Sequence, residues 1–384
     1  KTWLPPTVSG MFTEESNSQK GLRFTLDVEA LPPRATAGVT FSLLQSRSAP
    51  FGLHAEVTSG LSGYTPAHFL EKNATFTVWQ GDTPRRVLTG IVTGFDLAQN
   101  AHGQMGYALT LSPPLWRCGL RQNFRLFQQQ NIADITATLL TEHGVTGRVS
   151  RFYEAHPARE FCVQYGETDL GFLSRLWAEE GIFFYDSCAS GGAEQKLVLT
   201  DDVAGVATVG DLPFNPNTRT GVLTDCISEF RYRAQIRPAS VQTQDYTFKA
   251  PSWQGTFSHH PRELNGQRAY YEIFDYPGRF KDEQHGRDFA RYQAEGYRQD
   301  AETATCRSNS PVLWPGRRFT LPAHPSCPLN REWQVTGSLL EGRQPQAQHG
   351  SPGEGTTLSN RLEVIPADRT WRATPLLKPR VDGP

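Results

Sequence analysis

Two adjacent histidines, His259 and His260, come closest in this sequence to a pattern that could bind a metal or transfer protons, with Glu263 nearby. Neighbouring side chains on a strand point to opposite faces, so the two imidazoles cannot easily chelate one ion. Pro261 follows them directly and indicates a turn. We therefore expect solvated loop histidines here, with no catalytic or metal-binding role.

Two pairs of neighbouring carboxylates, Glu179-Glu180 and Asp201-Asp202, are the next candidates for acid–base chemistry. Such catalysis requires carboxyl groups that converge across a cleft and whose pKa values are pushed apart. Residues adjacent in sequence do not supply this geometry. We expect Asp201 to end a strand with a hydrogen bond in the following turn.

Four tryptophans, at positions 177, 253, 314 and 371, could line a sugar-binding surface. Packing in the core or at an interface is the stronger interpretation, because the indole buries a large apolar area. Ser62 lies between Gly60 and Gly63 but lacks the spacing of a nucleophile elbow, and the phosphate-loop, dinucleotide and zinc-protease patterns do not occur. The sequence therefore predicts no catalytic residue, no metal, no cofactor and no enzyme activity.

The composition indicates a chain of several domains that is mostly β. At 384 residues the chain is too long for one ordinary core, and 34 Gly with 27 Pro indicate many turns. The 38 Lys and Arg balance 39 Asp and Glu, which argues against a nucleic-acid partner, and no apolar run reaches the roughly 20 residues of a membrane span. Six scattered cysteines indicate reduced, mostly buried thiols, and residues 1–20 lack the apolar core of a secretory signal.

Residues 161–185 contain three of these candidates, Trp177, Glu179 and Glu180, and form the most clearly patterned segment of the chain. A short apolar run predicts a strand, Thr168 predicts a helix N-cap, and Gly181 predicts the helix end before another strand. Between them, apolar residues recur at helical spacing and form one wide face. Glu179 and Glu180 stand at the unfavourable end of the helix dipole, which helix propensity alone does not explain.

This segment resembles the signature of the VgrG family, the spike proteins of bacterial type VI secretion systems, which are related to the central hub of contractile phage tails. It reads Cys-Val-Gln-Tyr-Gly-Glu-Thr-Asp-Leu-Gly-Phe-Leu-Ser-Arg-Leu-Trp-Ala-Glu-Glu-Gly-Ile at 162–182. Several shorter sequence motifs similar to those of the family occur in the same order as in the family. At His324 we expect a structural hydrogen bond. The resemblance implies structural motif residues at Cys162, Gln164, Tyr165, Glu167, Thr168, Asp169, Leu170, Phe172, Ser174, Arg175, Leu176, Glu179, Glu180, Gly181, Tyr276, Pro277, Gly278, Pro315, Gly316, His324 and Pro325.

Outside this segment the hydrophobic period changes along the chain. Residues 21–116 alternate apolar and polar side chains in several short runs, which predicts an antiparallel barrel or sandwich. Asn131 then predicts the N-cap of a helix that Gly144 ends. We expect a polar surface helix near 282–299, interrupted by its two glycines, and a flexible loop at 342–357.

We expect a mostly β (α+β) fold of two similar antiparallel β-barrel domains with intervening helices, like a phage tail hub. The Phe-Thr-Val at 76–78 and the Val-Thr-Gly at 92–94 start sixteen residues apart, as do the Phe-Thr-Leu at 319–321 and the Val-Thr-Gly at 335–337. This spacing suggests two copies of one hairpin unit, although unrelated hairpins rich in common β residues would give the same words. The expected division is a leader at 1–20, a first barrel at 21–117, a connecting region at 118–182, a second barrel at 183–366 and a linker at 367–384.

The resemblance implies a homotrimeric hub that joins a hexameric Hcp-like tube to a needle. Further partners would be baseplate proteins and, beyond the linker, a C-terminal needle with a PAAR-like tip and effectors, none of which this sequence includes. The hub would assemble in the cytoplasm and then be injected into a target cell by sheath contraction. Two alternatives stay open: the hub of a contractile phage tail or related injection particle, and a β-rich carbohydrate-binding or hydrolytic protein that uses the tryptophans.

Overall fold

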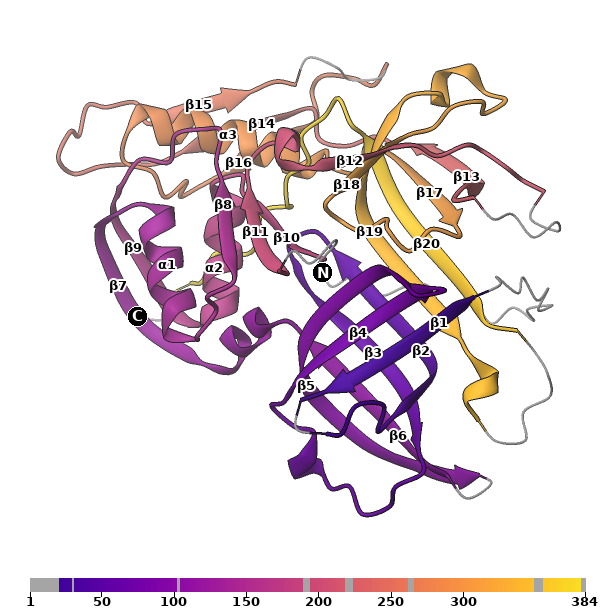
Figure 1. Ribbon diagram of the computed structural model, residues 1–384. Coiled ribbons are helices and arrows are strands. Elements are labelled where there is room, and N and C mark those ends of the chain that lie inside the picture. The colour runs from indigo at the N-terminus through magenta and orange to yellow at the C-terminus, as the bar shows by residue number, and fades with distance from the viewer. Residues whose placement is uncertain are drawn as a thin grey trace.

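The computed structural model describes residues 21–29, 31–101, 104–188, 194–217, 224–261, 266–348 and 355–380. The expected leader at 1–20 lies outside these residues. Strands dominate, and three α-helices occur in the described part of the chain (Figure 1). No helix among these residues is long and apolar enough to cross a membrane.

The first six strands form a curled antiparallel sheet with neighbours in the order β1-β4-β5-β6-β3-β2 (Figure 1). Alternate side chains point inward, so Leu22, Phe24 and Leu26 enter one core. The curl brings the two end strands together, because the rings of Phe24 on β1 and Phe41 on β2 lie 4.7 Å apart. The strands are β1 (Leu22–Val28), β2 (Ala37–Ser46), β3 (Ala49–Ser59), β4 (Asn73–Gln80), β5 (Thr83–Ala101) and β6 (Gln104–Ser112).

A second set of six strands repeats this order as β12-β18-β19-β20-β17-β13. A bridge between Phe214, just beyond β12, and Ile227 on β13 brings the two ends of the set together. Trp333 and its apolar neighbours fill the enclosed core. The strands are β12 (Ala207–Asp211), β13 (Ile227–Ala234), β17 (Glu302–Ser308), β18 (Arg317–Thr320), β19 (Glu332–Arg343) and β20 (Thr357–Pro366).

The two sets match in chain order as well as in space. Each strand of the first set corresponds to the strand at the same place in the chain order of the second set, so β1 corresponds to β12 and β5 to β19. Both Val-Thr-Gly tripeptides carry a register shift, between Val92 and Gly94 on β5 and between Val335 and Gly337 on β19. This shared bulge supports the hypothesis that the hairpins are copies of one unit. One pair departs from it, because β12 runs parallel to β18 whereas β1 runs antiparallel to β4.

Strands β2 and β19 join the two sets into one 12-stranded sheet. Their pairing runs from Ser46 opposite Gly337 to Thr40 opposite Arg343. A Cβ at Gly342 would lie 2.3 Å from the ring of Phe41, so the backbones approach closely at this seam. The large sheet is thus continuous between the two units.

The region between the two sets packs two helices against a two-stranded ribbon and a small sheet. Asn131 accepts from the backbone N–H of Asp134 and Gly144 adopts a φ of 69°, which confirms the predicted ends of α1. Strand β7 was not predicted. Strand β11 pairs with β10 on one side and with β8 on the other, so this small sheet spans the expected boundary at residue 183. The elements are β7 (Gln122–Gln130), α1 (Ile132–Glu142), β8 (Arg148–Arg151), β9 (Arg159–Thr168), α2 (Asp169–Glu179), β10 (Phe183–Ser187) and β11 (Lys196–Thr200).

A third group, β14 (Ser240–Gln244), β15 (Thr256–His259), β16 (Glu272–Asp275) and α3 (Glu283–Tyr297), is inserted between β13 and β17 (Figure 1). The expected interruption of this helix at its glycines is wrong. A Cβ at Gly286 would lie 2.3 Å from the ring of Phe257, and one at Gly296 would lie 2.5 Å from the carbonyl oxygen of Ala373. The glycines therefore permit close packing along one continuous helix, whose apolar face is buried.

The remaining elements are short, and the C-terminal part runs without regular structure. Residues 367–380 form neither helix nor strand, yet they bury Trp371 and Arg372. Of the loop expected at 342–357, the structure assigns the start to β19 and to a short helix, and residues 349–354 lie outside the described part. The short helices are η1 (Pro66–His68), η2 (Pro114–Leu120), η3 (Val203–Gly205), η4 (Cys327–Leu329) and η5 (Pro345–Ala347).

Candidate functional site

The signature at 162–182 forms most of β9 and the helix α2 and ends directly before β10, as the sequence predicts. The hydroxyl of Thr168 accepts from the backbone N–H of Gly171 at 3.0 Å and caps α2. The apolar face of α2 is buried, and Phe172 stacks on Phe127 of β7 with ring centroids 5.7 Å apart. Gly181 ends the helix with a φ of 68°.

Asp169 is fully buried in the first turn of α2 and has three partners. Its carboxylate accepts from Arg121 Nε at 2.6 Å and from Gln164 Nε2 at 2.7 Å, and His143 Nε2 lies 2.7 Å away. Burial alone would raise the pKa of Asp169, but the hydrogen bonds from His143, Gln164 and Arg121 outweigh it and lower the pKa. The residue ties α2 to β9 and to the loop after α1.

The glutamates at the C-terminal end of α2 are explained by buried arginines. Arg159 on β9 pairs with Glu179 at 2.7 Å and with Glu180 at 2.6 Å. Arg175 pairs with Glu167 at 2.7 Å and with Glu179 at 3.2 Å. These ion pairs offset the unfavourable helix dipole, because each carboxylate faces a cation at short range.

His156 extends this cluster toward β11. Its Nδ1 lies 3.0 Å from Glu180 and its Nε2 lies 2.9 Å from Asp201. Burial would lower the pKa of His156, but its hydrogen bonds to Asp201 and Glu180 raise it to about 9. Asp201 directly follows the end of β11, but its side chain accepts from the backbone N–H groups of Tyr153 and Glu154, far away in sequence, and not in the following turn as expected.

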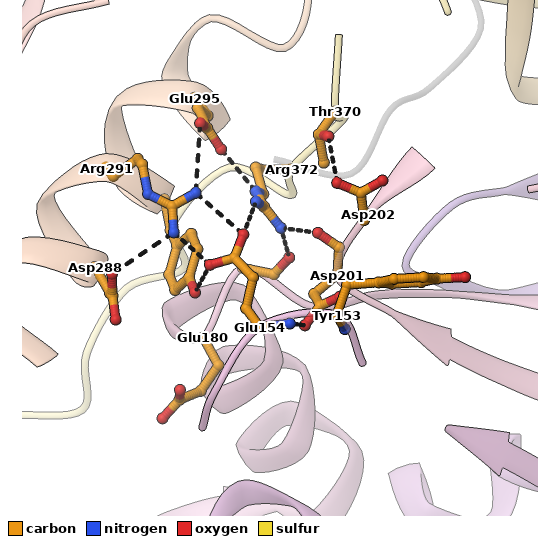
Figure 2. Close-up of polar contacts among 12 residues, drawn as sticks. Tyr153, Glu154, Glu180, Asp201, Asp202, Asp288, Arg291, Glu295, Thr370 and Arg372 are labelled. Atoms are coloured by element: carbon orange, nitrogen blue, oxygen red, sulfur yellow. Dashed lines mark hydrogen bonds and ion pairs between the residues drawn. The ribbon is translucent and has the colours of Figure 1, made fainter. Parts of the chain in front are cut away.

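Figure 2 shows a second cluster, in which Glu154 meets Arg291 of α3 and Arg372 of the C-terminal segment. Arg372 is almost fully buried and also donates to Glu295 at 2.7 Å and to the carbonyl oxygen of Gly181 at 2.6 Å. Burial of Glu154 opposes its charge, but hydrogen bonds from Arg291 and Tyr292 lower its pKa to about 2. Three segments far apart in sequence therefore meet at one carboxylate.

We call these two clusters together the charged junction: Glu154, His156, Arg159, Glu167, Asp169, Arg175, Glu179, Glu180, Asp201, Arg291, Glu295 and Arg372. Each carboxylate in it already faces a cation or a hydrogen-bond donor. Within the described residues no group of three His, Cys, Asp or Glu side chains could hold a metal ion. Chemically, the arrangement can hold α2, α3, β9 and the C-terminal segment in fixed positions.

Sequence reasoning found only part of the junction. The signature supplied Glu167, Asp169, Arg175, Glu179 and Glu180. His156 and Arg159, which pair with these glutamates, lie outside the signature. Glu154, Arg291 and Arg372 of the second cluster were missed as well. A hint was available, since helix-terminal carboxylates with no local compensation require cations from elsewhere.

The later motif residues lie apart from the junction and are explained by close packing. A Cβ at Gly278 would lie 2.2 Å from the ring of Phe280, and one at Gly316 would lie 2.5 Å from the ring of Tyr185. His324 accepts from the backbone N–H of Ser326 through Nδ1 at 3.0 Å, which confirms the expected structural hydrogen bond. Tyr276, Pro277, Pro315 and Pro325 flank these positions, with Tyr276 exposed.

The other chemical candidates take structural places. The expectation of a solvated loop is wrong for His259, which is half-buried on β15 opposite Val241 and whose pKa is lowered by burial. His260 is exposed beyond the strand, and Glu263 lies outside the described residues. The side chain of Asp202 accepts from the backbone N–H of Ala204. Of the four tryptophans, those at 177, 314 and 371 are buried, which confirms core packing for these three. Trp253 is half-buried and packs on Phe257 and Phe280.

The six cysteines are unpaired thiols, as the sequence predicts. Five of them are buried, and Cys327 is exposed. Burial raises the pKa of Cys162, Cys188 and Cys306. These thiols therefore behave as small apolar groups within their cores.

Comparison with known proteins identifies the class of protein to which this chain belongs. Residues 46–346 match the family described as the phage tail baseplate hub (GPD). The chain belongs to this family. A solved structure of the E. coli c3393 protein, described as a type VI secretion component similar to the T4 tail proteins gp27 and gp5, superposes with a TM-score of 0.68. It shares 19% identity over 92% of this chain and 81% of that chain, which shows the fold.

The resemblance to VgrG spike proteins is confirmed by curated relatives from Vibrio cholerae. The type VI secretion system spike protein VgrG3 is 35% identical over 336 residues, which cover 87% of this chain and 33% of that protein. The actin cross-linking toxin VgrG1 is 34% identical over 374 residues, which cover 94% of this chain and 34% of that protein. The chain thus spans about a third of the length of these relatives.

Proposed function

We propose that this chain is the hub of a type VI secretion spike, a homotrimer that joins a hexameric Hcp-like tube to a C-terminal needle. The observation that carries the proposal is the pair of six-stranded units with one strand order and one shared bulge. Three chains would present six such units around one axis. A threefold trimer would then match the symmetry of a sixfold ring.

The proposal includes a division of the chain. The first barrel comprises residues 21–117 and the second comprises the large strands within 183–366, joined by the connecting region 118–182. Residues 1–20 are a leader, and residues 367–384 lead toward a needle, with its PAAR-like tip and effectors. Support comes from the continuous sheet through β2 and β19 and from the C-terminal segment that Arg372 anchors.

The role of the hub is mechanical in this proposal, and it has no enzyme activity of its own. Sheath contraction pushes on the tube, and the hub passes this force to the needle. Two features support such a role: the sheet seam between the units, and the charged junction that holds the C-terminal segment against α2 and α3. Assembly with baseplate proteins in the cytoplasm, followed by injection into a target cell, completes the proposal.

The experiment mixes this chain with hexameric rings of an Hcp-like protein and measures the mass of the complex by native mass spectrometry. We expect three copies of this chain for each ring of six. Rings alone and this chain alone are the controls. A complex of any other ratio, or none at concentrations where both components assemble, would contradict the proposal.

A contractile phage tail or a related injection particle is the second candidate, favoured by the family match itself. The fold is the same in both cases, so the mechanism does not change. The neighbouring genes distinguish them. Genes for a tube, a sheath and a membrane complex support the secretion system, whereas capsid and tail-fibre genes support the phage.

A further inference from the structure

The ribbon of β7 and β9 exposes apolar side chains, whereas an ordinary surface strand exposes polar ones. On β9 the inward positions carry buried Cys162 and Gln164, whereas the outward positions carry Phe161, Val163 and Tyr165. These three side chains are 47%, 42% and 37% exposed. A strand at the surface of a soluble protein normally turns its polar side chains to water, so the pattern is typical of a covered face.

The partner strand repeats the pattern. Phe124 and Leu126 of β7 pair with Tyr165 and Val163 of β9, and they are 65% and 56% exposed. The rings of Phe124 and Tyr165 meet edge to face, with centroids 5.1 Å apart. Five apolar side chains from two paired strands therefore form one continuous patch, which we call the ribbon face.

A cavity of about 610 Å³ opens directly beside the ribbon face. Phe161, Val163 and Tyr165 form one wall, and Pro277 and Phe280 contribute to the other. Two charged groups at the cavity, Lys249 and Glu160, pair with each other at 2.7 Å, and Arg279 donates to the carbonyl oxygen of Pro379. An apolar centre with charges paired beside it is the usual anatomy of a protein–protein interface.

The area of the ribbon face fits a protein partner. Large apolar side chains bury about 150–250 Å² each, so the five exposed parts amount to about 500 Å². Such an area is near the upper limit for a patch left open on a monomer. It also supplies more than half of the ~800 Å² per partner that a standard interface buries.

We propose that the ribbon face is buried against a second copy of this chain. The proposal rests on the trimeric hub proposed above and names one surface that builds it. A ring of three copies uses two different surfaces per chain. The chain offers further exposed aromatic side chains outside the ribbon, Phe274 and Tyr276, which are 56% and 63% exposed.

The test uses the full chain with Leu126→Lys and Val163→Lys together, which places two charges on paired positions of the ribbon face. Both side chains already contact water, so the monomer fold is retained, and circular dichroism checks this. The matched control is Leu61→Lys, since Leu61 is 54% exposed and lies in a loop far from the ribbon in sequence. Native mass spectrometry and analytical ultracentrifugation measure association over a wide concentration range.

We expect the wild-type chain and the control to associate, and the double variant to associate at least about thirty-fold more weakly, the loss typical of an interface hot spot. A double variant that associates like the wild type overturns the inference. If both then form a complex of three copies, the proposed trimeric hub still stands. A wild-type dimer that the double variant abolishes supports the ribbon contact but contradicts the trimeric hub. A wild-type chain that stays monomeric at all concentrations overturns the inference, and the tube-binding experiment then decides the hub separately.

Discussion

The guanidinium group of Arg372 lies 3.2 Å from the carboxylate of Glu154, a residue 218 positions earlier in the chain (Figure 2). The same guanidinium donates to Glu295 of α3 and to the backbone carbonyl of Gly181 at the end of α2. One side chain thus fixes the C-terminal segment to two helices. Lys378 adds a second tie further along the segment, because its Nζ lies 2.7 Å from the carboxylate of Asp275.

Replacing Arg372 with Met should lower the free energy of unfolding by about 3–5 kcal/mol, because two carboxylates lose the buried cation they share. The measurement is urea denaturation followed by fluorescence. Arg361→Met is the matched control, since Arg361 is half-exposed and pairs with Glu341 at 3.6 Å. The control should cost less than about 1 kcal/mol. Equal losses in the two variants would show that burial of the junction adds nothing.

Gly181→Ala should destabilise the protein more than Gly144→Ala does. Both glycines end a helix with nearly the same positive φ, 68° and 69°, so both variants share a backbone cost of about 1–2 kcal/mol. A Cβ at Gly181 would lie 2.5 Å from the ring of Tyr292, whereas a Cβ at Gly144 meets no atom within 4 Å. Overpacking at Gly181 should therefore add about 1–3 kcal/mol. Thermal unfolding of both variants gives the difference, and equal melting temperatures would contradict the packing of α2 on α3.

The stability of the junction should fall in alkaline solution because of His156. Its folded pKa is about 9, above the ordinary value of about 6.5, so the folded state binds the proton more tightly than the unfolded state does. This contribution is fully present below pH 6.5 and is lost as the pH rises through 9. The free energy of unfolding of the wild type, measured from pH 6 to 9.5, should decline more steeply than that of His156→Gln. Parallel curves would show that protonation of His156 does not stabilise the fold.

Local signals in the sequence were sufficient for the helix ends. Thr168, Asn131 and Gly181 act through backbone contacts within one turn, so residue type and position predict their roles. These helix ends require no knowledge of the rest of the chain. The equal spacing of the two Val-Thr-Gly tripeptides suggested two copies of one hairpin, whereas the register shift that they share is seen only in the structure.

Contacts between distant segments were not predictable in the same way. No residue near Glu180 in the sequence indicates that Arg159 and His156 pair with it, since these two residues lie on a strand and in a loop that precede α2. Strand β7 escaped notice because its outward side chains, including Phe124, are apolar and obscure the usual alternation. Gly286 was interpreted as a break, whereas the structure uses it to admit the ring of Phe257.

Gln344 closes the first six-stranded unit, and its replacement should open that unit locally. Its side-chain Oε1 accepts from the backbone N–H of Phe24 on β1 at 2.8 Å, and its Nε2 donates to the carbonyl of Gly38 on β2 at 3.2 Å. Gln344→Ala should leave both backbone groups without this partner, at a cost of about 1–3 kcal/mol.

Hydrogen exchange at the Phe24 amide reports this change directly, and it should be markedly faster in Gln344→Ala. Gln346→Ala is the matched control, because within the described residues its side chain donates to the hydroxyl of Thr356 and not to β1 or β2. Exchange at Phe24 should be unchanged in the control. If both variants protect Phe24 as well as the wild type does, then the curled sheet holds its end strands together without the bridge, and the closure depends on the packing of Phe24 against Phe41 alone.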